Sequence, residues 1–375
     1  MSVIIVTLPG DYHAHAVRWA VHKLGGDARI LYPFDICASS EWSLDPGTGV
    51  LQMDSRGSQQ AVRRSEYDTV WVRRPAGIFP LNNISDTIQR AVAEDELRAF
   101  VTGVLSWLEI GKFTVNPMQA TALAGLKSFQ FPLAAQLGLT GPRTLISNSP
   151  AEILSFFKSC GGEFIYKPLR SALWPRDRGD KVTVPTTLIT DSTLLLESDL
   201  RSGPGIYQEK IVKQAEIRAT FMGKSMFAWE KRFEGRPQED LDIDWRTMNR
   251  GADHRIHDLP DDIKAKCSKL LSALNLHFGA FDFAIDQNGE YQFLEVNPQG
   301  QFLWGDQLRL GLNQLEAFAE FLLSGDPEFC YSHSNRFNLD DYHNLGTYDN
   351  DLLEESSLHD GALLEYNYRQ VSLSL

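Results

Sequence analysis

The sequence lacks the features that mark several protein classes. Its 375 residues include only four cysteines, Cys37, Cys160, Cys267 and Cys330, which lie far apart without C-x-x-C spacing. This excludes a zinc knuckle or a disulfide scaffold and is typical of the reduced cytoplasm, where we expect the protein to be. The apolar runs are only strand-length, so we expect no membrane span and no membrane partner. The N-terminal stretch Ser2–Val6 predicts a buried strand rather than a signal peptide.

Positive charge is also scarce. The chain has 36 Lys and Arg against 49 Asp and Glu, a formal net charge of −13. Binding to nucleic acid depends on a positive surface that neutralises phosphates, so the composition argues against nucleic acid as a partner. Apolar residues make up 43% and charged residues 23% of the chain, which is ordinary globular composition and excludes wholesale disorder. Any anionic ligand must therefore be met by locally concentrated Lys and Arg.

The order of predicted elements indicates an α/β protein. The N-terminal part alternates strand and helix patterns, expected at 3–6, 12–24, 28–32, 69–72, 86–110 and 113–115. Such alternation predicts a mostly parallel sheet with helices on both faces. After it we expect a helix at 120–137 that carries Lys127, and a mobile loop at the polar, Gly/Pro-broken stretch 169–182. Further strands are expected between 206 and 231 and at 278–285 and 291–296, and further helices at 261–274 and 308–323.

Three oxygen-bearing side chains are expected to meet on a hairpin. Asp282 lies on one predicted strand, and Glu295 and Asn297 lie on its partner. Because positions 295 and 297 are two apart on an extended chain, their side chains leave the same face, and Asp282 can lie across from them. Two carboxylates and one amide are hard oxygen ligands that suit Mg²⁺. The sequence therefore predicts a magnesium site on this hairpin.

Lysines, arginines and one extended segment predict a nucleotide site. Lys127 and Lys167 are compact charges suited to phosphate oxygens, although each alone would be an ordinary surface residue. The segment Gln208-Glu209-Lys210-Ile211 can offer its backbone to an adenine edge, and Glu216 can accept hydrogen bonds from ribose hydroxyls. Five arginines are candidates for stabilising phosphoryl or acyl-phosphate charge: Arg73, Arg74, Arg218, Arg232 and Arg246.

In this order, the motifs resemble those of the ATP-grasp ligases, and more closely the peptide-modifying branch typified by microviridin-type (graspetide) macrocyclases. The segments that carry the resemblance are VWVRRP (70–75), NPMQATALAGLKSFQFPLAAQLGLTGPRTLISN (116–148), PGIYQEKIVKQAEIRATFMGK (204–224), DWR (244–246) and FLEVNPQGQFLW (293–304). One departure concerns the loop after Lys167-Pro168, which lacks the Gly-rich character of many ATP-grasp phosphate loops.

The resemblance implies an ATP-grasp fold with three parts and a tail. An N-terminal parallel-sheet domain would span 1–118, a central α+β subdomain 119–205 and a C-terminal subdomain 206–330. Residues 331–375 hold two basic and eight acidic residues, a net charge of 2 − 8 = −6. We expect them to form a solvated, partly disordered acidic tail.

The resemblance also implies a role for each motif residue. Lys127 and Lys167 would hold ATP phosphates, Gln208 and 209–211 would face adenine, and Glu216 the ribose. Asp282, Glu295 and Asn297 would bind Mg²⁺. Arg218 and Arg232 would face the transferred phosphate, and Arg246, with Arg73 or Arg74, would hold the peptide carboxylate. The cofactors would be ATP and Mg²⁺, the partner a ribosomally made precursor peptide with leader and core, and the assembly a homodimer.

The implied reaction activates an Asp or Glu side chain of the peptide as an acyl phosphate and releases ADP. A Thr or Ser hydroxyl or a Lys amine then closes an ester or amide ring. The alternative is an intermolecular carboxylate–amine ligase that adds an amino acid to a small molecule or a protein terminus. A nucleotide-sensing module without turnover, and an α/β enzyme whose motifs coincide by chance, are two further alternatives.

Overall fold

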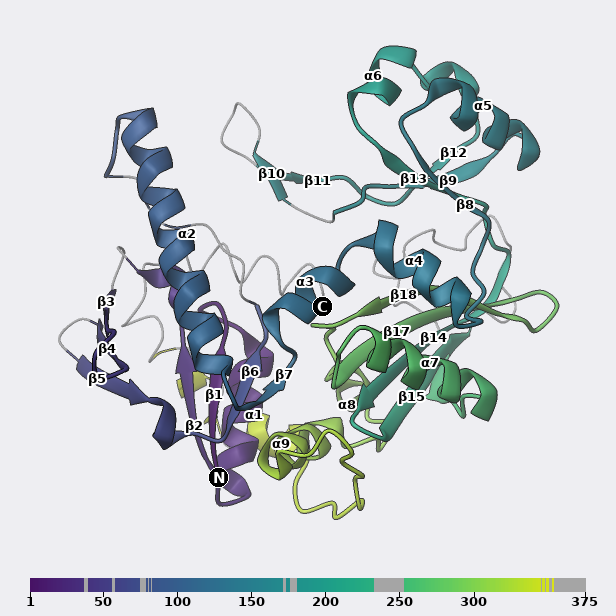
Figure 1. The fold of residues 1–375 in the computed structure, drawn as a ribbon. Helices are drawn as coiled ribbons and strands as arrows, with labels where there is room; N and C mark the ends of the chain where they lie inside the picture. The colour runs from purple at the N-terminus through teal and green to yellow at the C-terminus, as the bar shows by residue number, and fades with distance from the viewer. Residues whose placement is uncertain are drawn as a thin grey trace.

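The protein is described by a computed structural model (Figure 1). It describes residues 1–36, 40–55, 58–74, 79, 81, 83–170, 173–175, 181–232, 253–344, 346, 347, 349, 350 and 353. Arg246 and the DWR motif lie outside these residues, as do 171, 172 and 176–180 of the stretch expected to be a mobile loop. No helix in the described part is long and apolar enough to cross a membrane.

A parallel sheet forms the centre of the N-terminal region, as the alternating pattern predicted. Its strand order is β2-β1-β6-β7, with β1 (Ser2–Val6), β2 (Asp27–Leu31), β6 (Thr69–Val72) and β7 (Phe113–Val115). Alternate residues of β1 enter two cores: Val3 and Ile5 pack with α1 (Tyr12–Lys23), and Ile4 and Val6 with α2 (Thr87–Glu109). The sheet therefore has helices on both faces.

A small antiparallel sheet and two short 3₁₀ helices complete this region. They are β3 (Ser40–Asp45), β4 (Val50–Ser55) and β5 (Ser58–Arg63), with η1 (Pro33–Asp35) and η2 (Arg64–Glu66). Leu51, Met53 and Val62 join the core beneath α2. In Figure 1 the first half of α2 extends away from the sheet at the upper left.

The central region has an antiparallel sheet of order β12-β9-β13-β8. Its elements are α3 (Met118–Ala124), α4 (Lys127–Gln136), β8 (Thr144–Ser147), α5 (Pro150–Ser159), β9 (Phe164–Lys167), β12 (Thr187–Ile189), η3 (Ser192–Leu194), α6 (Glu197–Ser202) and β13 (Gly205–Gln208). The single helix expected at 120–137 is two helices, because the chain leaves helical geometry at Gly125 and Leu126, so Lys127 begins α4. The stretch 169–182 is not a loop throughout, since β10 (Leu173–Pro175) and β11 (Lys181–Thr183) pair there as antiparallel strands.

A larger antiparallel sheet of order β16-β15-β14-β17-β18 forms the C-terminal region. Its strands are β14 (Lys213–Met222), β15 (Ser225–Arg232), β16 (Asp253–Ile256), β17 (Phe278–Asp286) and β18 (Tyr291–Asn297). One face packs on α7 (Asp261–Ala273), through residues such as Ile217, Phe283 and Leu270. Figure 1 shows α4 between this sheet and the central sheet.

The chain then returns to the N-terminal region. The helix expected at 308–323 is α9 (Gln314–Ser324), preceded by α8 (Trp304–Gln307). It starts late because Arg309, Gly311 and Asn313 all have positive φ, which ends one helix and delays the next. The side chains of α9 pack against α1 and the parallel sheet.

The segment expected to be a solvated tail is folded at its start. Tyr331, Leu339 and Tyr342 are buried in the core that α1 and α9 share, and α10 (Leu339–Asn344) lies on α1. Tyr12 Oη and His343 Nε2 share a hydrogen bond of 2.6 Å. Residues 331–344 are mostly exposed, as expected of a solvated tail, but three apolar or aromatic side chains anchor them to the core. Residues 354–375 lie outside the described residues.

Candidate functional site

A row of side chains crosses one face of the C-terminal sheet. Arg218 on β14 lies opposite Trp229 on β15 and opposite Asp282 on β17, and Asp282 lies opposite Glu295 on β18. Residues directly opposite one another in an antiparallel sheet point to the same face. The other face packs on α7, whereas this face carries polar side chains at one end and contributes Met222, Phe227 and Phe278 to the core shared with α9 at the other. The register confirms that Asp282 lies across from Glu295.

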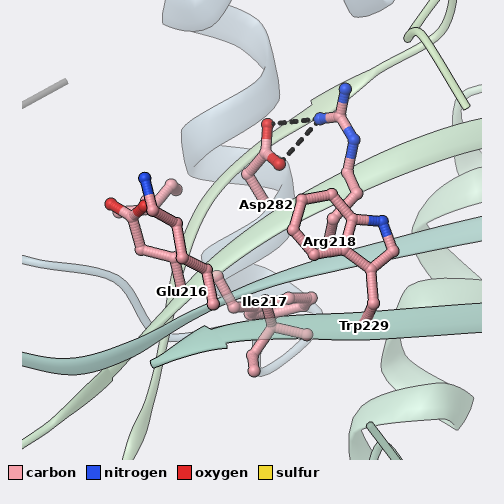
Figure 2. Close-up of a pocket in the computed structure, with 8 residues that line it drawn as sticks. Glu216, Ile217, Arg218, Trp229 and Asp282 are labelled. Atoms are coloured by element: carbon pink, nitrogen blue, oxygen red, sulfur yellow. Dashed lines mark hydrogen bonds and ion pairs between the residues drawn. The ribbon is translucent and has the colours of Figure 1, made fainter. Parts of the chain in front are cut away.

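Two ion pairs link this row to its surroundings. Arg218 Nη1 lies 2.7 Å from both carboxylate oxygens of Asp282 (Figure 2). Lys127 Nζ, at the start of α4, lies 2.5 Å from Glu295 Oε2. Burial, together with the neighbouring negative charge of Glu295, raises the pKa of Asp282 to about 6 despite Arg218. The positive charge of Lys127 lowers the pKa of Glu295 to about 2. Burial opposes this effect, and Lys167 and Arg218 add to it.

The oxygen atoms on this face fit a hard divalent cation. Asn297 is two residues beyond Glu295 on β18, and its side-chain oxygen accepts a hydrogen bond from Gln299 N at 2.9 Å. Within the described residues no three His, Cys, Asp or Glu side chains are grouped as a metal site. The donor set is therefore two carboxylates and an amide, which suits Mg²⁺ when water and phosphate oxygens supply the other ligands.

The two lysines approach this face from different elements. Lys127 comes from α4, and Lys167 comes from β9 of the central sheet, where its Nζ donates a hydrogen bond to Gln208 Oε1 at 2.7 Å. Lys167 is close enough to help lower the pKa of Glu295. The structure thus brings both lysines toward the same carboxylate.

The 208–211 segment and Glu216 lie at the edge of this arrangement. Glu209 N donates to Arg143 O at 2.9 Å, and the Glu209 carboxylate pairs with the Arg143 guanidinium. The Lys210 side chain lies 3.5 Å from Glu163, so both of these side chains have partners away from the row. Glu216 pairs with Lys213 at 2.6 Å and is close enough to raise the pKa of Asp282.

A pocket on the same face contains residues that sequence analysis missed. It is lined by Glu216, Ile217, Arg218, Trp229, Lys231, Asp282, Phe283 and Leu294 (Figure 2). Trp229 and Lys231 alternate along β15, and Lys231 lies opposite Glu216. Once the 225–231 strand is paired with 216–222, this alternation identifies Lys231 as a third lysine of the site.

The same alternation excludes Arg232 from this face. Arg232 lies opposite Ala215, whose side chain packs on the α7 side of the sheet. Its Nε donates to Glu230 at 2.6 Å, and the buried Glu230 also pairs with Arg255 and His257. Strand parity therefore places Arg232 on the sheet face opposite to Arg218 and Asp282, and its role at the transferred phosphate stays a prediction. Arg246 lies outside the described residues.

Arg73 and Arg74 are found at a second cluster, in the N-terminal region. Arg73 Nε donates to both oxygens of Asp11 at 2.8 and 2.9 Å, and Arg74 Nε lies 3.4 Å from Asp11 Oδ2. Gln299 Nε2, just after β18, donates to Val72 O at 3.4 Å. This contact joins the cluster to the loop that follows Asn297.

Comparison with known proteins gives matches among solved structures. No family model matches the chain, and no curated protein matches it. The macrocyclase MdnC of Microcystis aeruginosa MRC, solved with its precursor peptide MdnA, is 24% identical with a TM-score of 0.75 over 87% of this chain and 100% of that one.

Two further structures are similar. A Chryseobacterium gregarium RiPP-associated ATP-grasp ligase, in complex with ADP and a leader and core peptide, is 22% identical with a TM-score of 0.75 over 87% of this chain and 97% of that one. The macrocyclase MdnB of Microcystis aeruginosa MRC is 25% identical with a TM-score of 0.70 over 86% and 99%. The chain therefore has the fold of the ATP-grasp ligases and macrocyclases that its motifs resemble.

Proposed function

We propose that this chain is an ADP-forming ATP-grasp ligase that closes rings in a ribosomally made peptide. The observation that carries the proposal is the row Lys127, Glu295, Asp282 and Arg218, which puts metal-binding oxygens and phosphate-binding cations on one sheet face. Its support from the comparisons is that proteins of this fold were solved with ADP and with precursor peptides.

The side chains of the row would bind and neutralise ATP. Lys127, Lys167 and Lys231 would contact phosphate oxygens, and Arg218 would face the transferred phosphoryl group. Asp282, Glu295 and Asn297 would hold Mg²⁺, which supplies positive charge at the phosphates. The backbone of 209–211 would face adenine, and Glu216 would accept from the ribose.

The internal ion pairs keep this highly charged face close to neutral before ATP binds. Lys127 would leave Glu295 and pair with a phosphate oxygen, while the Glu295 carboxylate turns to the metal. Arg218 would leave Asp282 for a phosphate oxygen in the same way. Each cation keeps an anionic partner through the exchange, so no buried charge is left alone.

The proposed reaction has two steps. A carboxylate oxygen of an Asp or Glu side chain attacks the γ-phosphorus, the bond to the bridging oxygen breaks and ADP leaves. A Thr or Ser hydroxyl or a Lys amine then attacks the acyl carbon, phosphate leaves, and the nucleophile loses its proton. The net change is the loss of one water per ring.

The experiment incubates the purified chain with Mg²⁺, ATP and the peptides encoded by short neighbouring reading frames. We expect ADP rather than AMP, and a mass loss of about 18 Da per ring, as acyl-phosphate capture by an internal nucleophile requires. A mass gain equal to an added amino acid would favour the intermolecular ligase instead. AMP and pyrophosphate would contradict acyl-phosphate chemistry.

The assembly and location are also part of the proposal. Ile88 and Val92 on the projecting half of α2 are 74% and 57% exposed, and such an apolar stripe suits a homodimer contact. Light scattering should give a dimer mass for the wild type and a monomer mass for Val92→Glu.

A cytoplasmic location is supported by Cys160, Cys267 and Cys330, which are free thiols. The division at 118, 205 and 330 stays a prediction.

A further inference from the structure

One carboxylate, Asp11, holds together three elements of the N-terminal region. The parallel strands β1 and β6 end side by side, and Asp11 and Arg73 follow them at the same edge of the sheet. In open parallel sheets this edge is where ligands bind. Asp11 is also the N-cap of α1, because its Oδ1 accepts from His13 N at 3.0 Å and Ala14 N at 3.4 Å.

Asp11 is buried but charged. Its side chain is 2% exposed, and it accepts from Thr7 Oγ1 at 2.9 Å as well as from Arg73. Burial alone would favour the protonated form, but Arg73, Arg74 and His13 together hold the pKa of Asp11 well below its usual range. The carboxylate therefore serves as a fixed negative charge between two guanidinium groups.

The two arginines are not equivalent. Arg73 is 1% exposed, and its Nη2 is buried without a hydrogen-bond partner among the described residues. Arg74 is 21% exposed and shares Asp11 through a longer contact of 3.4 Å. Within the described residues, Asp11 is the one carboxylate that pairs with either of them, so two positive charges share one negative charge.

This cluster adjoins the candidate site. The pKa of His13, two residues after Asp11, is lowered mainly by burial and by Arg73, but Arg74 and Arg218 also contribute. His13 Nε2 accepts from Leu303 N at 3.5 Å, and Gln299 binds Val72 O. The arginine pair and the Arg218–Asp282 pair thus lie on two sides of the loop that follows β18.

We propose that Arg74, with the unpartnered Nη2 of Arg73, binds the side-chain carboxylate of the acyl-donor residue of a peptide, and that Asp11 is a positioning residue for both arginines. The inference rests on the proposed function and deepens it by naming which arginine meets the substrate. A carboxylate suits the site because it supplies the missing negative charge, and because a planar guanidinium binds carboxylates through two parallel hydrogen bonds. The peptide carboxylate also gives the buried Nη2 of Arg73 a hydrogen-bond acceptor. A buried donor without an acceptor costs free energy of folding.

The test compares Asp11→Asn with Asp86→Asn. Asn is a good N-cap, so both variants keep their helix starts. Asp86 caps α2, whose first half projects away from the parallel sheet (Figure 1). The probe is acetyl-Gly-Thr-Gly-Gly-Glu-Gly-amide, which carries one carboxylate, and its Glu→Gln twin. NMR titration gives binding, and ADP release gives KM and kcat.

We expect Asp11→Asn and Arg74→Ala to weaken binding of the Glu peptide about tenfold, with the KM for ATP unchanged and Asp86→Asn like the wild type. All forms of the protein should bind the Gln peptide equally weakly. This peptide lacks the carboxylate that contacts Arg74, so replacing Arg74 removes nothing further. A merely structural role would lower the unfolding temperature without this peptide dependence. Arg73→Lys, which keeps the charge, serves if another variant fails to fold.

The outcomes separate the two proposals. Binding of the Glu peptide that depends on Asp11 and Arg74, without any ADP release by the wild type, would remove the proposed function and keep this inference. ADP release that is insensitive to both variants would keep the function and overturn the inference. Equal binding of the Glu and Gln peptides by the wild type would also overturn it.

Discussion

Two Arg–Asp pairs with nearly the same geometry differ in the state of their carboxylates. Arg218 lies 2.7 Å from Asp282, and Arg73 lies 2.8 Å from Asp11. The pKa of Asp282 is raised to about 6, whereas that of Asp11 is held far below its usual range. The cause lies beyond each pair: Asp282 faces a second carboxylate, Glu295, and Asp11 faces a second arginine and a helix N-terminus.

The difference indicates what each pair can do. Asp282 and Glu295 lie side by side but are balanced by Arg218 and Lys127, so this face has no excess of either charge before ligands bind. Asp11 carries less negative charge than its two arginines need, so that edge favours an added anion. The Arg–Asp distance alone does not reveal this difference between the two pairs.

The largest expected effect is on stability, at the N-terminal pair. Arg73→Ala leaves Asp11 charged and buried, and breaking such a pair costs about 3–5 kcal/mol of the free energy of unfolding. Arg218→Ala should cost clearly less, because Asp282 can take up a proton near neutral pH. Urea unfolding at pH 7 measures both. Equal losses would mean that the two pairs do not differ as described.

The next effect is on activity, at the C-terminal sheet. Glu295→Ala or Asn297→Ala, or removal of Mg²⁺ with a chelator, should lower ADP release at least about a hundredfold by removing charge stabilisation at the phosphates. Folding should be little changed, since Glu295 is partly exposed. The control is Glu197→Ala, which removes an exposed surface pair with Arg201 and should act like the wild type. Wild-type rates in either site variant would contradict the metal assignment.

The third effect is on the pH dependence of stability in buffer without Mg²⁺. Because the folded-state pKa of Asp282 is raised to about 6, its proton stabilises the fold below about pH 4, and this stability is lost as the pH rises through 6. The wild type should therefore lose about 2 kcal/mol between pH 4.5 and 7 that Asp282→Asn does not lose. Asp11→Asn should still show the wild-type loss between pH 4.5 and 7, because Asp11 is charged in both the folded and the unfolded state there. The stability that the lowered pKa of Asp11 contributes is lost only as the pH falls below about 4, and only the proteins that keep Asp11 lose it. Parallel pH curves for all three proteins would contradict these assignments.

The smallest effect concerns the acidic residues after Asn344. Positions 345–375 hold six acidic residues and one arginine, which can compete with a peptide carboxylate for Arg74. A chain that ends at Asn344 should have an unchanged KM for ATP and a KM for peptide lowered a few-fold, less so at high salt because exposed charges are then screened. Insolubility of this shorter chain would mean that the segment is part of the fold.

Much of the fold and part of the site follow from local pattern. The parallel sheet follows from alternating strands and helices, and the Asp282–Glu295 juxtaposition follows from a hairpin with a readable turn. Local pattern does not show whether Lys231 or Arg232 faces the site. Neighbouring residues on a strand point to opposite faces, and the register that decides between them depends on the turn at Gly223. Contacts between distant residues were equally hidden: Asp11 and Arg73 are 62 positions apart, and no local signal joins them.

The α1–α10 contact has a consequence for how the protein is made. Tyr12 and His343 are 331 positions apart, yet Tyr342 completes the core around α1. During synthesis, domains generally fold in order from the N-terminus as the chain emerges. Here α1 keeps an apolar flank exposed until α10 has also been translated. The N-terminal region, which holds the arginine pair, is therefore among the last to be completed.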